Sequence, residues 1–384
     1  MCRLIGRPAA HSTQSHLQNP EHLCDNLAEM TSPSIEERLT SLAKPPGSLG
    51  LLEEWATVLC EVQCTLTPQV DAVTVIVFAA DHGVKRADEK ISPFPSSVTQ
   101  AVFRALAVGV SGTGVLCRAN GAHLTVVDCG VNGDLCSVAS PAGSAITVCH
   151  AKVSTGTADM RVGPAMTEAE LEAALRVGRE RVADEAAQRG ARCVGIGEIG
   201  IGNTTSAAAL LATLTGATAA ECCGRGTGLD EPGLAHKIST VQAARDFHAA
   251  AIAGAGPDAA AAAREALRRV GGLELAAMAG AFLEAHERRI VAMVDGFISA
   301  VAALAAVRMQ PACRASMLFA TALAEEPRAG RGGEVLAGAL EATPALQMGL
   351  RLGEASGAAL ALPLLRSAAA MITQMATLQE ALAL

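Results

Sequence analysis

Aromatic residues are scarce in this chain: they make up 2% of its 384 residues, and tyrosine is absent. Half of the residues are nonetheless hydrophobic, which is enough for a sizeable core in one large domain or two smaller ones. Alanine and glycine dominate the second half of the chain. We therefore expect a core of aliphatic and small side chains in which helices and sheet approach each other closely.

The chain also has no block of lysine and arginine with interleaved aromatic residues, and its formal net charge is −8. Surfaces that bind nucleic acid are normally basic, because they neutralise phosphates. Both observations argue against nucleic acid as the main partner.

Paired cysteines of the kind that bind zinc are missing as well. The twelve cysteines are scattered without a CxxC pair, and no HExxH or HxH spacing occurs. We interpret the cysteines as reduced, buried side chains in a reducing compartment rather than as a disulfide framework. The sequence therefore predicts no metal site and a cytoplasmic protein.

The apolar run at residues 290–307 is interrupted by Asp295 and Ser299. An aspartate in the middle of a bilayer is costly, so a buried strand, turn and helix is expected here instead of a membrane span. Residues 1–30 are rich in Ser, His and Gln, with no acidic residue before Glu21. We expect a disordered extension there, and targeting of the chain to an organelle by this segment stays open.

Strand-like runs alternate with helical patterns along the rest of the chain. Buried strands are expected at residues 71–80, 123–127, 193–196 and 289–294. Helices are expected at residues 34–65 (broken by a turn at 44–50), 95–117, 167–188, 233–253, 258–269 and 272–287, and over most of the last 60 residues. This alternation predicts an α/β fold with a mostly parallel sheet flanked by helices.

A glycine-rich turn, GEIGIGNTT at residues 197–205, follows one of these strands and opens a helix. Backbone N–H groups at such a helix start can bind a phosphate. A second glycine turn lies at residues 224–230, and Lys237 could neutralise a phosphate or simply lie on a solvated helix face. Because Glu198 is acidic, it cannot help to bind phosphate. We expect it to act on another group of the ligand, next to the phosphate.

Residues 195–200 also match the GxGxxG pattern of dinucleotide-binding proteins, and Glu221 follows where a ribose-binding acid would lie. An NAD-dependent oxidoreductase is therefore an alternative. Asp81 and His82 follow a strand without further metal-ligand companions, which favours a structural or supporting role for them. From the residues alone, Glu325 and Glu326 would be surface charges.

Eight motifs, in order, resemble those of the nicotinate-nucleotide–dimethylbenzimidazole phosphoribosyltransferase family, and the resemblance is collinear from about residue 33 to the C-terminus. They are KPPGSLG (44–50), FAADHGV (78–84), SPFPSSVT (92–99), GEIGIGNTT (197–205), GRGTGLD (224–230), GGLELAAMAG (271–280), DGFIS (295–299) and RLGEASGAALALP (351–363).

The resemblance implies a homodimer with a Rossmann-like large domain and a small helical domain built from both chain ends. We assign residues 67–334 to the large domain, and residues 31–66 with 335–384 to the small one. It further implies transfer of phosphoribose from nicotinate mononucleotide to 5,6-dimethylbenzimidazole, in assembly of the cobalamin lower ligand. The products would be α-ribazole 5′-phosphate and nicotinate, and no redox cofactor would be used.

The same resemblance assigns roles to individual residues. Glu326 matches the catalytic base of the family, and Glu198 matches its second active-site carboxylate. Phe94 and Val102 fall where the family lines its base pocket. The candidate binding site for phosphate and ribose comprises Gly200, Gly202, Asn203, Thr204, Thr205, Gly224, Gly226, Lys237 and Ser299.

The chain departs from the family pattern at two places. Arg328 and Ala329 replace the Gly-His that many members carry after the base, and Ala355 replaces the second glycine of Leu-Gly-Glu-Gly. Two further alternatives therefore stand beside the named reaction: a phosphoribosyltransferase for another base, and a carrier of benzimidazoles or their nucleosides that has lost turnover.

Overall fold

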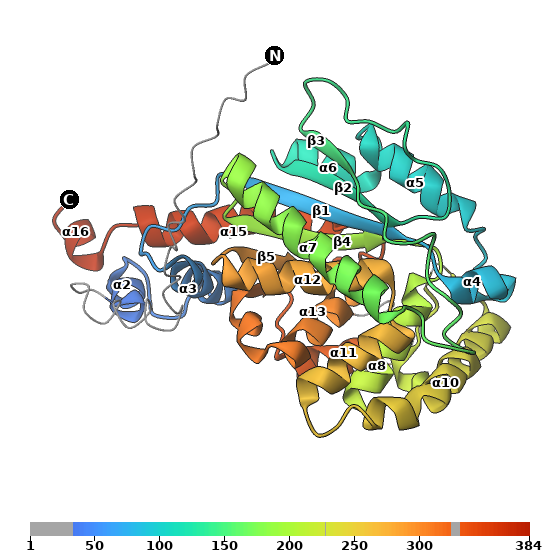
Figure 1. Ribbon diagram of the computed structural model, residues 1–384. Coiled ribbons are helices and arrows are strands. Elements are labelled where there is room, and N and C mark those ends of the chain that lie inside the picture. Colours follow the sequence, from blue (N-terminus) through green and yellow to red (C-terminus); the bar gives the residue numbers. More distant parts are fainter. Residues whose placement is uncertain (1–33, 227, 324–330) are drawn as a thin grey trace, which may run out of the picture.

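The computed structural model describes residues 34–226, 228–323 and 331–384. The expected N-terminal extension (residues 1–30) and Glu326 lie outside this part of the chain, as do the altered residues Arg328 and Ala329. Figure 1 shows a central sheet with helices packed on both sides. The predicted α/β class is confirmed.

The sheet has six strands, all parallel, in the order β3-β2-β1-β4-β5-β6. The order reverses at β1 and β4, whose carboxyl ends therefore flank a topological switch point, the usual ligand position in such sheets. The strands are β1 (Val73–Ala80), β2 (His123–Gly130), β3 (Ile146–His150), β4 (Cys193–Ile199), β5 (Val291–Val294) and β6 (Met317–Phe319).

Each face of the sheet has its own hydrophobic core. In β1, Ile76 and Phe78 point to one core and Val75 and Val77 to the other, as the twofold alternation of a strand requires. The first core lies under α7 (Glu168–Arg189), α8 (Asn203–Thr215), α11 (Ala259–Val270), α12 (Leu273–Glu287) and α13 (Phe297–Met309). The second lies under α3 (Leu51–Gln63), α5 (Ser97–Ala107), α6 (Gly112–Ala119) and α15 (Ser356–Gln374).

The remaining helices are shorter or more peripheral. They are α2 (Ile35–Ser41), α4 (Gly83–Ala87), α9 (Ala219–Cys222), α10 (Glu231–Ala253), α14 (Gly332–Leu340) and α16 (Leu378–Leu382), with 3-10 turns η2 (Glu89–Ile91) and η3 (Pro311–Ser316).

Two local predictions were wrong, and two strands were missed. The helix expected at residues 95–117 is two helices, because Gly109 takes a φ of +75° and Ser111 starts α6 by accepting a hydrogen bond from the N–H of Gly114 (3.0 Å). Strand β4 continues to Ile199, so the glycine turn starts only at Gly200. The short strands β3 and β6 were not predicted.

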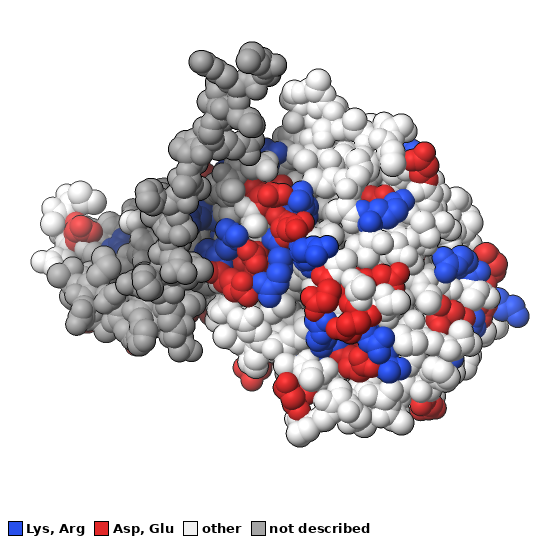
Figure 2. Space-filling view, viewed as in Figure 1, with Lys and Arg blue, Asp and Glu red and all other residues white. Residues whose placement is uncertain are grey.

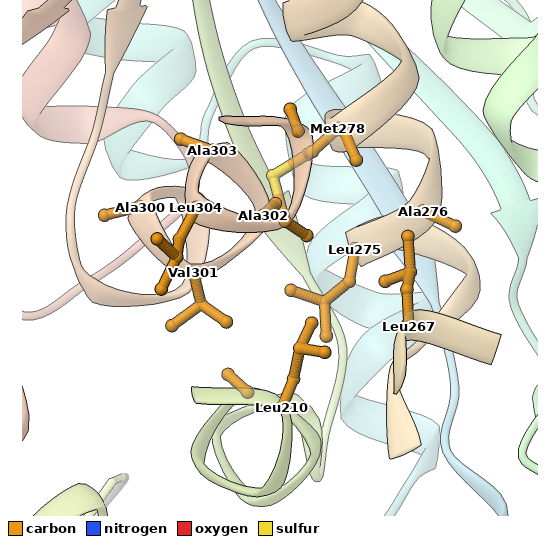
Figure 3. Packing of buried hydrophobic residues seen from close by; sticks show 14 of the residues in the cluster. Leu210, Leu267, Leu275, Ala276, Met278, Ala300, Val301, Ala302, Ala303 and Leu304 are labelled. Atoms are coloured by element: carbon orange, nitrogen blue, oxygen red, sulfur yellow. The ribbon is translucent and has the colours of Figure 1, made fainter. Parts of the chain in front are cut away.

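Small side chains let the helices of the first core pack closely, as the composition predicted. In Figure 3, Leu275 and Met278 of α12, Ala302 of α13 and Leu210 of α8 meet in this core. Helices α7 and α12 touch through glycine: a Cβ on Gly178 would lie 1.7 Å from the carbonyl oxygen of Ala277. There is no room for aromatic rings at such a contact.

The two ends of the described chain lie side by side (Figure 1). The Arg38 guanidinium of α2 donates to the carbonyl oxygens of Ile372 (3.0 Å) and Met375 (2.9 Å), and Leu42 pairs with Thr377 in an isolated bridge. Helix α3 packs on α15. This contact supports a small domain from residues 31–66 and 335–384, and the division stays a prediction.

On the face in Figure 2, acidic and basic side chains are interspersed. Ion pairs also join helices, for example Arg179 of α7 with Glu284 of α12 (3.1 Å). By length and composition, residues 97–119 and helix α15 could each cross a membrane. Buried core helices pass the same test, so this finding carries little weight.

We predict that Gly178→Ala destabilises the protein by about 1–3 kcal/mol, because the added methyl group must push α7 away from α12. The matched control is Gly338→Ala in α14, where a Cβ would meet nothing within 4 Å. That variant should be more stable than wild type by about 0.5–1 kcal/mol, since alanine favours a helix. Urea unfolding of both variants measures the difference, and equal stabilities would contradict the close contact.

Candidate active site

A cavity of about 260 Å³ opens at the carboxyl ends of β4 and β5. Its wall includes the ends of these strands, the start of α5, the turn before α8 and the segment before α15. It brings together eight residues that were predicted for the site: Phe94, Val102, Glu198, Gly200, Asn203, Thr204, Gly226 and Ser299.

The glycine turn between β4 and α8 requires its glycines. A Cβ on Gly200 would lie 2.2 Å from the carbonyl oxygen of Ala80, and Gly202 has a φ of +102°. The turn therefore lies directly against the end of β1, and the first turn of α8 faces the cavity through Asn203 and Thr204. The positive end of α8 is suited to an anion there.

Lys237 lies behind this part of the wall. Its side chain is buried, and its ammonium group donates to the hydroxyl of Thr204 and to the carbonyl oxygen of Gly224, both at 3.0 Å. A positive charge thus stands next to Thr204 and Gly226, which do line the cavity. Lys237 is not on a solvated face.

Most of the other residues predicted to bind phosphate and ribose lie near the cavity and not on its wall. Gly202 lines a small adjoining hollow, Thr205 is buried within α8, and Gly224 holds Lys237. Ser299 donates to the carbonyl oxygen of Ile196 (2.7 Å), which ties α13 to β4 at the edge of the cavity.

Glu198 is the penultimate residue of β4 and is buried at the base of the cavity. Its carboxyl group accepts a hydrogen bond from the Asn203 side-chain amide. Burial raises the pKa of Glu198 well above the ordinary value of 4.5, and nearby carboxylates, first Glu274 and then Asp295, raise it further. The neutral acid is therefore favoured.

Two more acidic residues reach the cavity, and the sequence reasoning missed both as site residues. Asp295 follows β5, and its carboxylate accepts hydrogen bonds from the N–H groups of Gly357 (2.6 Å) and Ala358 (3.0 Å) at the start of α15. Glu354 is buried, and burial raises its pKa as well. The signals that could have identified them were the position of Asp295 directly after a strand and that of Glu354 just before a helix.

Asp81 and His82 lie behind the cavity wall. The Asp81 carboxylate accepts from the hydroxyl of Thr99 (2.7 Å), which itself accepts from the N–H of Ile201 (3.1 Å) in the glycine turn. His82 lies 2.9 Å from a carboxylate oxygen of the buried Glu274 and 2.9 Å from the hydroxyl of Ser206. The contact of Thr99 with Ile201 holds the glycine turn in place, and the contact of His82 with Ser206 holds α8.

Burial would lower the pKa of His82, but the Glu274 carboxylate outweighs this effect and the pKa is raised. An imidazolium is thereby favoured beneath the glycine turn. Among the described residues, no three His, Cys, Asp or Glu side chains are arranged to hold a metal ion.

One wall of the cavity is apolar, with side chains from the start of α5, from α13 and from the segment before α15. Its members are Phe94, Val98, Val102, Phe297, Ile298, Leu350 and Leu352. Such a wall suits a flat, uncharged ring.

The geometry does not support the dinucleotide alternative. Gly195 and Gly197 lie inside β4, where a Cβ on Gly197 would be 2.4 Å from the backbone nitrogen of Ala355. They are needed for this packing, and they do not form a turn around a pyrophosphate. Glu221 caps α9 through Thr218 instead of facing the cavity.

Comparison with known proteins agrees with this geometry. A family model described as "Phosphoribosyltransferase" matches residues 24–382. A nicotinate-nucleotide–dimethylbenzimidazole phosphoribosyltransferase from Pseudomonas putida is 43% identical over 358 residues, 93% of this chain and 95% of that protein. One from Pseudomonas aeruginosa is 45% identical over 345 residues, 90% and 92% of the two chains. The crystal structure of CobT from Thermus thermophilus matches with a TM-score of 0.80 at 36% identity, over 93% of this chain and 98% of that one.

We predict that Asp295→Asn makes stability less dependent on pH. Burial raises the pKa of Asp295 from 3.8 to about 7, so between these values the folded protein holds a proton that the unfolded chain releases. The stability contribution of Asp295 therefore falls as the pH rises through this window. Asparagine has no such proton, and its amide oxygen can still accept from Gly357 and Ala358.

Urea unfolding at about pH 4.5 and about pH 7.5 tests this prediction. Wild type should lose more stability than Asp295→Asn between the two values. Glu334→Gln, at an exposed position on α14, is the control and should behave as wild type does. Parallel losses in Asp295→Asn and wild type would show that Asp295 does not titrate in this range.

Proposed function

This chain belongs to the phosphoribosyltransferase family, and we propose that it transfers phosphoribose from nicotinate mononucleotide to 5,6-dimethylbenzimidazole. The products are α-ribazole 5′-phosphate and nicotinate. The observation that carries the proposal is one cavity with a glycine turn and the start of α8 on one side and an apolar wall on the other. Such a cavity suits a nucleotide beside a flat base, and it lies at the carboxyl ends of β4 and β5, next to the switch point of the sheet.

The leaving group needs no acid catalyst. Nicotinate is bound to the ribose C1′ as a pyridinium, and the electron pair of the breaking bond returns to the ring nitrogen. The acceptor is a neutral benzimidazole, whose lone-pair nitrogen attacks C1′ from the opposite side. Positive charge builds on the acceptor, so a carboxylate that takes its N–H proton speeds the reaction.

We assign that base to Glu326, as the family resemblance implies. Glu326 lies outside the described residues, and the assignment draws support from its place in the chain. Thr321 and Ala322 line the cavity, and Glu326 follows Ala322 by four residues, which span at most about 14 Å. This sequence separation is compatible with a role for Glu326 at the cavity.

The described residues supply the rest of the site. The phosphate is proposed to bind at the glycine turn and the first turn of α8, with Lys237 behind it. Glu198, favoured as a neutral acid, can donate a hydrogen bond to an oxygen of the ribose, and Asn203 fixes its orientation. Phosphate and ribose together hold C1′ between the leaving group and the acceptor, which lowers the entropic part of the barrier.

We further propose that the chain acts as a homodimer. Val108 and Val110 in the turn between α5 and α6 are 56% and 71% exposed, and Val115 on α6 is 44% exposed. These exposed apolar side chains lie within eight residues of one another in the chain, and exposed apolar patches are often covered by a partner. Size-exclusion chromatography with light scattering measures the mass directly.

The function is tested by incubating purified protein with nicotinate mononucleotide and dimethylbenzimidazole in the absence of NAD. Chromatography should show nicotinate release matched by α-ribazole phosphate. Release only with a purine or a phenol as acceptor would support a transferase for another base. Tight binding of both substrates without release would support the carrier alternative.

We predict that Glu326→Gln lowers kcat by about 10²–10⁴-fold, the usual contribution of a general base, with little effect on nucleotide binding. Glu325→Gln is the matched control, because it makes the same change one residue away and should retain activity. Steady-state kinetics and nucleotide titration separate the two effects. Full turnover in Glu326→Gln would remove this residue from the mechanism.

A further inference from the structure

Arg351 is the one basic side chain among the described residues that line the cavity. The other charged groups on this wall are the acids Glu198, Asp295 and Glu354. The side chain of Arg351 is exposed at the cavity, and it forms no hydrogen bond or ion pair with any described residue. Its guanidinium therefore has all of its donors available to a ligand.

The segment that carries Arg351 is held in an unusual backbone conformation. Gly353, Glu354 and Ala355 have φ values of +75°, +61° and +62°, and the last two are not glycine. A left-handed conformation at a residue with a side chain costs about 1 kcal/mol or more, and it persists where the surroundings enforce it, often at functional sites.

Three contacts enforce this conformation. The N–H of Glu354 donates to the carbonyl oxygen of Glu198 (3.1 Å), which joins the segment to the end of β4. Asp295 holds the following residues at the start of α15. Leu352 packs against Gly112, where a Cβ would lie 2.6 Å from the Leu352 side chain. The backbone of Arg351 is thus positioned at the cavity, although its side chain is exposed.

The proposed donor substrate carries two anionic groups. Its phosphate has a site at the glycine turn with Lys237, on the β4–α8 side of the cavity. The carboxylate on its pyridine ring still needs a cation, and Arg351 is the basic side chain that the described part of the wall offers.

We propose that Arg351 binds the carboxylate of the nicotinate ring and so makes the enzyme prefer the acid to its amide. This inference rests on the proposed function. A guanidinium matches a carboxylate with two parallel N–H···O bonds, whereas a neutral carboxamide can accept only through its single oxygen.

Such a contact also strengthens during the reaction. In the bound nucleotide the pyridinium charge offsets the ring carboxylate, so the leaving group is neutral overall. As the C1′–N bond breaks, its electron pair neutralises the ring nitrogen, and the departing nicotinate carries a full negative charge. The attraction to Arg351 is therefore larger in the transition state than in the substrate complex, which raises kcat as well as affinity.

The test compares nicotinate mononucleotide with nicotinamide mononucleotide as donors. Arg351→Gln should lower kcat/KM for the acid by about tenfold to a hundredfold, the usual effect of losing a charge-assisted hydrogen bond, and change the value for the amide by about twofold at most. Arg351→Lys keeps the charge and should restore part of the preference. Arg176→Gln, at an exposed residue of α7 outside the cavity, is the control and should leave both values unchanged.

A parallel measurement does not depend on turnover. Calorimetric titration should show wild type binding nicotinate more tightly than nicotinamide, and Arg351→Gln binding the two alike. Equal losses for acid and amide donors, or an unchanged preference in Arg351→Gln, would overturn the proposal. Absence of turnover in wild type would instead contradict the proposed function, and the titration would still decide the role of Arg351.

Discussion

The Asp295 carboxylate, which bonds to the backbone at the start of α15, is the contact on which the site depends. It joins the end of β5 to a helix that begins about 60 residues later, through the N–H groups of Gly357 and Ala358. Burial raises the pKa of Asp295 to about 7, and the N–H groups of Gly357 and Ala358 offset only part of this rise. The contact places the segment before α15 over the end of β4, and so closes the cavity above Glu198.

This arrangement divides the cavity into two electrostatic halves. The glycine turn, the positive end of α8 and Lys237 attract an anion on one side, whereas buried acids stand on the other. Burial raises the pKa values of Glu198, Asp295 and Glu354, and neighbouring carboxylates raise those of Glu198 and Asp295 further. In the proposed reaction we therefore expect the phosphate of the nucleotide in the first half, with its sugar and ring toward the second.

The sequence predicted the parts of this site that are local and not those that are assembled from distant residues. The buried strand before Asp81 and the glycine turn before α8 depend on neighbouring residues, and both were found. Glu198 was predicted, but Asp295 and Glu354 were missed because they lie far from it in the chain and no periodicity connects the three; only the topology of the sheet brings them together. The strands β3 and β6 were missed because they are too short to show a pattern. Glu326 was assigned as the base only from the family resemblance, since nothing in its neighbouring residues indicates that role.

The scarcity of aromatic residues and the chemistry of the site have one physical origin. Close contact of α7 and α12 through Gly178 and Gly280 leaves no space for rings, and it brings the start of α12 tightly against the sheet. Glu274 is thereby buried beside His82, where a Cβ on Gly272 would collide with both side chains. His82 in turn supports the glycine turn and α8. Larger core residues would widen these contacts, so the small side chains that make the core compact also hold the anion site in shape.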